Sequence, residues 1–258
     1  MRTLLAAIGF ALAAGSAQAQ ELRDFCAERP GKATPPCVVD KGHLMVETGL
    51  VDAVFVRGQD HSDLYALGAT AFRWGVSQRF EIGVDWIPLV VDRERGQESR
   101  TGVGDAALDV KAILTDPKAK GLAVAAQAFV IAPTATKGLG AGGWVGGLRL
   151  PVGTPLSPDT DFALTPELDL VRDADGHGSH LAWAAAAGVS HGFGATTLGA
   201  EVWGMVDDDP AERTYQASFD LSAARMFGDQ AQLDGGVNFG LNRSTPDVEV
   251  YVGVARRF

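Results

Sequence analysis

The C-terminal stretch VEVYVGVARRF, residues 248–258, decides the fold class of this chain. Its apolar valines alternate with glutamate, tyrosine, glycine and alanine, so a strand here has one apolar face and one mixed face. A strand with this two-residue period that ends on a C-terminal aromatic is typical of the closing strand of a bacterial outer-membrane β-barrel. We therefore expect an assembly signal, recognised by the barrel-assembly machinery, at Val250, Val252, Val254 and Phe258.

The N-terminus has the pattern of an export signal. Arg2 is followed by an apolar run over residues 4–14 and by the small-residue cleavage pattern Ala17-Gln18-Ala19. A membrane-spanning helix is the alternative, but it needs about 20 apolar residues and this run is shorter. The sequence predicts a signal peptide over residues 1–19 that is cleaved to leave Gln20 as the first residue.

Composition narrows the function classes. After Gln20 no apolar stretch reaches the ~18 residues of a spanning helix, so a membrane protein has to cross with strands. Loss of Arg2 with the signal peptide leaves 21 basic residues against 32 acidic ones, a net charge near −11. Such a charge argues against a nucleic-acid partner. A barrel in the outer membrane of a Gram-negative envelope, in contact with lipid and lipopolysaccharide, is the expected location.

The two cysteines lie close together, ahead of the first expected strand. Cys26 and Cys37 bracket a stretch that contains Pro and Gly, and in an oxidising periplasm we expect them to pair. Closing so short a loop is worth about 2 to 3 kcal/mol by chain entropy. A metal site is the alternative, although two thiols without a nearby His are a poor ligand set. The expected organisation is a signal peptide over 1–19, a periplasmic segment over 20–42 and a barrel over 43–258.

Segments of about ten residues that alternate apolar and polar side chains recur from His43 onward, separated by turn residues. Leu108 and Val110, for example, oppose Asp109 and Lys111. Twelve such segments predict an all-β, antiparallel up-and-down barrel of about twelve strands. The expected strands are His43–Phe55, Asp63–Trp74, Phe80–Pro88, Gly104–Thr115, Leu122–Ala132, Gly143–Val152, Asp161–Val171, His180–Val189, Ala195–Val206, Thr214–Ala223, Gln230–Gly240 and Val248–Phe258.

An even strand number places both chain ends in the periplasm and makes the odd-to-even connections the outer loops. The longest and most charged of these is Leu89–Val103, and Arg172–Ser179 is another. Gly153–Thr160 is long for a periplasmic turn. A secreted β-sandwich is the structural alternative, since its strands also alternate. The siting of the tryptophans on apolar strand faces favours a membrane barrel; they are Trp74, Trp86, Trp144, Trp183 and Trp203.

Three stretches resemble one known family of outer-membrane barrels. They are CAERPGKATPPCVVDKGHLMVETGL (26–50), GVGDAALDVKAIL (102–114) and LNRSTPDVEVYVGVARRF (241–258). The family is the one assigned to transport in the MetA pathway of phenol degradation. The resemblance covers most of the chain after Gln20 and implies an outer-membrane channel for passive passage of small solutes, aromatic compounds among them. The matching motifs are Cys26 and Cys37, Gly104-Asp105, and Asn242, Thr245, Pro246 and Asp247.

If the apolar faces meet lipid, the polar faces line the lumen and make it mostly acidic. Carboxylates along a wall favour cations and neutral solutes over anions. The alternative is that these acids pair with the inward Lys and Arg side chains, giving a closed structural or adhesion barrel that binds partners through its outer loops. The expected lumen-lining residues are Glu81, Asp85, Asp105, Asp109, Lys111, Arg149, Glu167 and Asp169.

Other motifs give weaker indications of function. The hexapeptide at 173–178, DADGHG, begins like a calcium loop but lacks the acidic ligand that ends one, so a solvated hairpin tip is expected, as for the acidic run 207–210. A barrel enzyme needs a His and a Ser held together with an orienting group, and His177, Ser179 and His180 are the close candidates. Because they lie in and beside a loop, we expect no enzyme, and no cofactor or resident metal.

Overall fold

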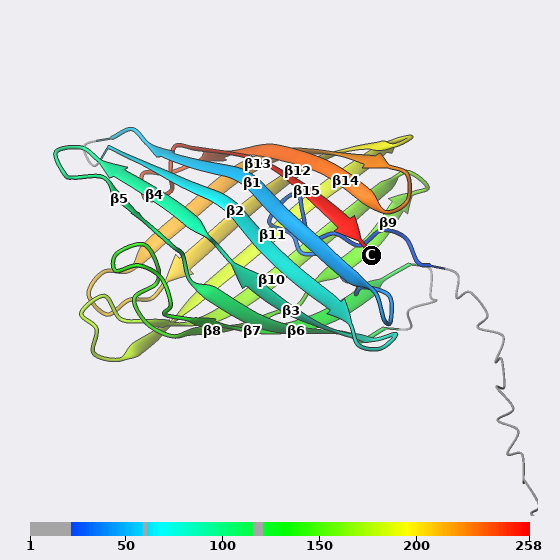
Figure 1. Cartoon of the computed structure of the whole chain (residues 1–258), viewed down its shortest axis with the longest axis horizontal. Coiled ribbons are helices and arrows are strands. Elements are labelled where there is room, and N and C mark those ends of the chain that lie inside the picture. The colour runs from blue at the N-terminus through cyan, green and yellow to red at the C-terminus, as the bar shows by residue number, and fades with distance from the viewer. Residues whose placement is uncertain (1–21, 59–60, 116–120) are drawn as a thin grey trace, which may run out of the picture.

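Antiparallel β-strands account for all regular secondary structure in the described chain (Figure 1). The structure is a computed structural model that describes residues 22–58, 61–115 and 121–258, so the predicted signal peptide and Gln20 lie outside it. Within the described ranges, no helix is long and apolar enough to cross a bilayer. The strands are β1 (Leu44–Val56), β2 (Ser62–Gly75), β3 (Phe80–Trp86), β4 (Leu89–Glu94), β5 (Arg100–Gly102), β6 (Ala106–Ile113), β7 (Ala123–Ala132), β8 (Val145–Arg149), β9 (Val152–Ser157), β10 (Thr160–Arg172), β11 (Ser179–Phe193), β12 (Thr196–Asp207), β13 (Thr214–Phe227), β14 (Ala231–Gly240) and β15 (Val248–Arg257).

These segments form one closed sheet. β1 pairs with β2 on one side and with β15 on the other, so the ring has no free edge. Three positions in the ring are each shared by two segments. β3 and β4 share one, because both pair with β2. β5 and β6 share the next, because they pair with β4 and β3, and β8 and β9 share the position between β7 and β10. The fifteen segments therefore make twelve strand positions around the ring, which confirms the predicted fold class.

Prolines divide two of the twelve positions. Pro88 separates β3 from β4, and Pro151 separates β8 from β9; proline has no N–H for the ladder, so pairing stops there. The expectation of an outer loop over residues 89–103 was wrong, because most of that stretch is the hairpin of β4 and β5. The expected turn over residues 153–160 is likewise mostly β9, with only a short turn left before β10.

The polarity of the barrel is inverted relative to a soluble protein. Arg73 is 1% exposed and Glu81 and Lys111 are 0% exposed, all on the inside of the ring, whereas Trp74 is 53% and Leu108 is 48% exposed on the outside. A soluble sandwich would bury the apolar faces instead. The apolar outer face fits hydrocarbon and every strand backbone has ladder partners, which is the construction of an outer-membrane barrel.

The closing strand has the predicted orientation. Val250, Val252 and Val254 are exposed on the outer face, as is Phe258, while Ala255 is buried inside. Trp203 corrects one expectation: it does not lie on the apolar exterior, because the Lys32 ammonium sits 4.7 Å from its ring centroid on the lumen side. Alternation along β12 agrees with this inward position, because the adjacent Val202 is exposed on the outer face; the expectation had followed the aromatic character of Trp203 instead.

Both ends of the described chain lie at the same end of the barrel (Figure 1). There, a guanidinium nitrogen of Arg257 donates a 2.9 Å hydrogen bond to the carbonyl of Arg23. Because the termini of such barrels face the periplasm, we call this the periplasmic end and the opposite one the outer end. The periplasmic turns include residues 158–159 and 194–195, and the outer loops include residues 133–144, 173–178 and 208–213.

Candidate functional site

The lumen contains the N-terminal segment. Residues 22–42, here called the plug, enter from the periplasmic end and run inside the ring of strands (Figure 1). The plug contacts inward side chains of strands on all sides, from β1 to β3 and β6 as well as from β12 to β15. Its residues Val38 and Val39 are almost fully buried. The predicted disulfide between Cys26 and Cys37 is present and joins the two limbs of the plug.

A buried cluster of charges fixes one side of the plug to β1, β2, β3 and β6. Arg73 lies at its centre, with Nη1 2.6 Å from Glu47 Oε1 and Nη2 2.7 Å from Glu81 Oε1. Lys111 pairs with Glu28 of the plug and lies 3.5 Å from Glu81. Because buried charges are tolerated only when paired, these wall residues and Glu28 depend on one another.

Backbone groups of the plug complete the cluster. The carboxylate of Glu47 accepts hydrogen bonds from the N–H groups of Glu28 and Arg29 at 3.0 Å, and Glu81 accepts one from Val39 at 2.7 Å. Arg73 donates to the carbonyl of Cys26 at 2.8 Å. The wall charges therefore bind the main chain of the plug as well as its side chains, which fixes its register.

Further ion pairs hold the base and the tip of the plug. At the periplasmic end, Asp40 lies 3.0 Å from Arg23 Nε and 3.1 Å from Arg257 Nη1. Arg29 reaches across to Asp234 on β14 at 3.1 Å. These contacts link the first described residues to the last strand, so the plug is anchored to the region that closes the barrel.

The tip of the plug, residues 29–34, touches the opposite wall. Glu201 on β12 accepts hydrogen bonds from the N–H groups of Lys32, at 2.7 Å, and Ala33, at 3.4 Å. Gly31 has φ +95°, a conformation that favours glycine, and a Cβ placed there would lie 2.8 Å from both carboxylate oxygens of Glu201. Only glycine lets the tip approach this closely.

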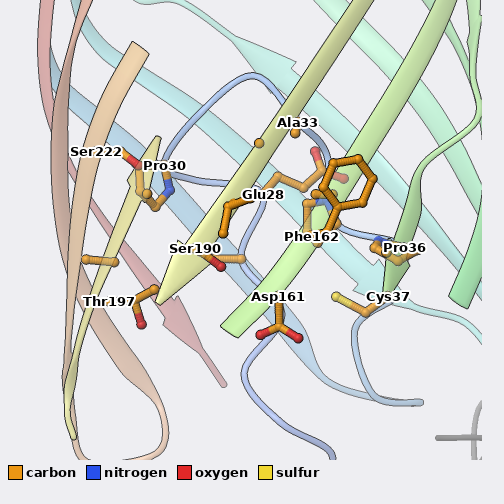
Figure 2. A pocket seen from close by; sticks show the side chains of 18 of the residues that line it. Glu28, Pro30, Ala33, Pro36, Cys37, Asp161, Phe162, Ser190, Thr197 and Ser222 are labelled. Carbon is orange, nitrogen blue, oxygen red and sulfur yellow. The ribbon is translucent and has the colours of Figure 1, made fainter. Parts of the chain in front are cut away.

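Among the cavities beside the plug, two lie mainly against the β9 to β13 part of the wall. The one at the periplasmic end has a volume of about 570 Å³ (Figure 2). The one toward the outer end has a volume of about 380 Å³. Glu28 lines both, so the two cavities approach each other at the plug. The charge cluster fills the lumen beside β1, β2, β3 and β6.

The wall of the periplasmic cavity is built from small side chains on the inner face of neighbouring strands. Figure 2 shows Ser190, Thr197 and Ser222 from the wall, with Glu28, Pro30 and Pro36 contributed by the plug. Small residues at these inward positions leave the space that larger ones would fill. Open space therefore remains in this part of the lumen, where the wall side chains are small. The small wall residues include Gly153, Ala163, Ser190, Thr197, Gly199 and Ser222.

The outer cavity combines an aromatic ring, a thioether and charges. Trp203 and Met205 supply the apolar part, and Lys32 of the plug tip places its ammonium 4.7 Å from the ring centroid of Trp203. Arg149 and Glu167 form a bidentate ion pair in which both N···O distances are 3.0 Å, so the two charges largely neutralise each other. Asp169 also lines this cavity, and one of its oxygens is buried without a hydrogen-bond partner.

The eight residues expected to line the lumen fall into three groups. Arg149, Glu167 and Asp169 line the outer cavity. Glu81 and Lys111 lie beneath the plug, in the charge cluster. The other three lie on β3 or on or just before β6. Asp85 is half-buried on β3, and Asp109 on β6 accepts a 2.9 Å hydrogen bond from Gln127. Asp105, just before β6, accepts hydrogen bonds from the backbone N–H groups of Ala135 and Ala141 in an outer loop.

Alternation in the wall did not identify the plug residues Glu28, Gly31 and Lys32, or their partner Glu201. The plug has no period of its own, so no face could be assigned to its side chains. A signal was present in its charge content: residues 23–41 carry seven charged side chains, although an exposed periplasmic segment needs none. Their complementarity to the inward charges of the wall becomes visible only in three dimensions.

Comparison with known proteins agrees with this architecture. A family model described as "Putative MetA-pathway of phenol degradation" matches residues 27–258. A search of curated protein sequences found no match. An outer membrane channel from Pseudomonas putida F1 superposes with a TM-score of 0.64 at 16% identity, covering 89% of this chain and 99% of that one.

Two further solved structures share the fold. The translocator domain of autotransporter NalP from Neisseria meningitidis gives a TM-score of 0.51 at 12% identity, covering 84% of this chain and 88% of that one. The KdgM porin gives 0.50 at 9% identity, covering 84% and 99%. At these identities the likeness establishes a common outer-membrane barrel fold, and the functions of these proteins differ among themselves.

Proposed function

The chain belongs to the MetA phenol-degradation family, and from that premise we propose that it is a passive outer-membrane channel for small solutes, aromatic compounds among them. The solute passes between the plug and the β9 to β13 wall. The observation that carries this proposal is the pair of cavities that approach Glu28 from the two ends of the barrel. The solved structure with the highest overlap given above is also described as a channel.

The chemistry of the two cavities favours neutral solutes that combine a flat apolar surface with a hydroxyl group. Trp203 and Met205 offer contact to an aromatic ring in the outer cavity. The carboxylates of Glu167 and Asp169 also line this cavity and are acceptors to which a hydroxyl can donate. The acidic residues Glu28, Asp161 and Glu201 line the periplasmic cavity, and their carboxylates disfavour anions. Aromatic alcohols meet all three conditions.

A closed structural or adhesion barrel is the second candidate, and the charge cluster favours it because it fills the lumen beside β1, β2, β3 and β6. The two candidates differ in one measurable property: a channel carries current across a planar bilayer, whereas a closed barrel does not. Catalysis is not part of the proposal. His180, one of the three residues considered for it, has both ring nitrogens directed at carboxylates and is not free to activate Ser179.

Inward acids outside the charge cluster should set the ion preference. Asp161 lines the periplasmic cavity and Asp169 the outer one, and neither forms an ion pair with any described residue. We expect the wild-type barrel to conduct with a cation preference, and Asp161→Asn with Asp169→Asn to shift its reversal potential in a KCl gradient toward zero. Glu98→Gln, at the exposed tip of the β4–β5 hairpin, is the control and should change nothing.

Absence of current from correctly folded wild-type protein would exclude the channel and leave the closed barrel. An unchanged reversal potential in the double Asp variant, with current present, would instead remove these two acids from the conducting pathway.

A further inference from the structure

Two outer loops meet around one histidine at the rim of the barrel. Residues 173–178 connect β10 to β11, and residues 208–213 connect β12 to β13. His180, near the start of β11, lies between them and is 8% exposed. Three carboxylates surround its ring, and they come from both loop regions: Asp173, Asp207 and Asp209. The sequence alone had indicated solvated loop tips here.

The distances place these groups within coordination range of one another. His180 Nδ1 lies 2.8 Å from Asp173 Oδ1 and 3.7 Å from Asp209 Oδ2. One ligand atom from each of these three residues lies within 4.8 Å of the other two. On the other side of the ring, Nε2 is 2.6 Å from Asp207 Oδ1. The imidazole is therefore held between one pair of carboxylates and a single opposing one.

The charges of this cluster do not balance. Three carboxylates face one imidazole, which contributes at most one positive charge. In the described part of the chain, none of the three acids pairs with Lys or Arg: Arg172 donates to the carbonyl of Gly176, and Arg213 pairs with Asp208. Asp209 instead accepts hydrogen bonds from the backbone N–H groups of Ala174, at 2.8 Å, and Ala211, at 2.7 Å.

The buried ring nitrogen is a separate observation. His180 Nε2 is inaccessible to solvent and makes no aligned hydrogen bond, despite the short approach of Asp207. A small rotation of the ring or of the carboxylate makes Nε2–H a donor to Asp207, which leaves the Nδ1 lone pair directed at Asp173 and Asp209. Histidines that bind metals commonly have this arrangement, with the second nitrogen donating to a carboxylate.

We propose that His180 Nδ1, Asp173 and Asp209 form a binding site for a divalent cation at the outer rim, with Asp207 orienting the imidazole. One nitrogen and two carboxylate oxygens suit a borderline cation such as Zn²⁺, which takes three protein ligands and a water. Ca²⁺ prefers six to eight oxygen ligands and suits this set less well. The bound cation supplies the missing positive charge and links the β10–β11 loop to the β12–β13 loop.

Calorimetric titration of the chelator-treated barrel in detergent with ZnCl₂ tests the site. We expect saturable binding of one Zn²⁺ per chain, undiminished by Ca²⁺, and loss of that binding in His180→Gln. Asp207→Asn should weaken affinity by about 10- to 100-fold, the usual effect of removing a carboxylate that orients a metal-binding histidine. His177→Gln and Asp175→Asn, in the same loop but outside the cluster, are matched controls that should bind as the wild type does.

Two results would overturn the proposal. One is the absence of saturable Zn²⁺ binding to the wild type, which would leave a protonated His180 held by its carboxylates. The other is binding that survives His180→Gln or is lost in His177→Gln, which would place the cation elsewhere. Should His180→Gln fail to fold, Asp209→Asn in the outer loop provides the same comparison, with β-sheet circular dichroism as the check on folding. The test does not depend on whether the barrel conducts.

Discussion

Removal of plug residues 22–37 should raise the single-channel conductance of the barrel severalfold. A ring of twelve strands has a backbone radius of about 12 Å, and the plug crosses this lumen and contacts the wall from β1 to β6 and from β12 to β15. Without the plug, the whole cross-section conducts. The measurement is the current through single barrels in planar bilayers, compared with the wild type at the same voltage and salt concentration.

A milder variant guards against misfolding of the truncated chain. Gly31→Val places a side chain where Glu201 now lies and keeps every anchor of the charge cluster, so it should displace only the tip and increase the conductance. Gly96→Val is the matched control, because Gly96 also has a positive φ, of +81°, but nothing lies within 4 Å of its missing Cβ. Equal conductance of the wild type, the truncated protein and Gly31→Val, all correctly folded, would show that the plug does not limit passage.

Arg73→Met should be the most destabilising single change in the barrel. The substitution leaves Glu47 and Glu81 buried without their common partner. Removing one member of a buried ion pair costs about 3 to 5 kcal/mol, since the remaining charge is uncompensated. The free energy of unfolding, followed by tryptophan fluorescence in urea for the barrel in detergent or lipid, should fall by this amount.

The control for Arg73 is a second arginine pair in a different environment. Arg100 pairs with Asp92, but its side chain is 45% exposed, and exposed pairs contribute about 0 to 1 kcal/mol. Arg100→Met should therefore change the unfolding free energy little. Adding Glu47→Gln and Glu81→Gln to Arg73→Met removes the unpaired charges and should restore part of the loss. A cost at Arg73 no larger than at Arg100 would contradict the role given to the cluster.

The sequence predicted the wall of this barrel well, because the alternation of apolar and polar side chains determines which way most wall residues face. Leu108 and Val110 against Asp109 and Lys111 fixed the two faces of β6, and the valines of the last strand did the same for β15. Strand number and closure followed from counting such segments. The errors had two sources. Pro88 and Pro151 interrupted the ladder without ending the strand position, and Trp203 was expected outside because it is aromatic, although its place next to the outward Val202 turns it inward, toward Lys32.

The plug could not be placed by the same means. Its fixed position depends on pairs separated by long stretches of sequence, such as Glu28 with Lys111 and Arg29 with Asp234. Each residue alone is an ordinary charged residue in a loop, and its partner in the wall is an ordinary inward acid or base. The expectation that Glu81 lines the lumen identified its face, but contact with Val39 and Arg73 decides what it does there.

The most direct test of passage beside the plug is the current through a barrel whose periplasmic cavity has been filled. Thr197→Phe with Ser222→Phe places two rings in that cavity, and Leu198→Phe with Leu221→Phe places the same rings on the adjacent lipid-facing positions. We predict that the first double variant, folded and with its plug intact, loses its single-channel current while the second conducts as the wild type does. Undiminished current through the filled barrel would contradict the proposed route.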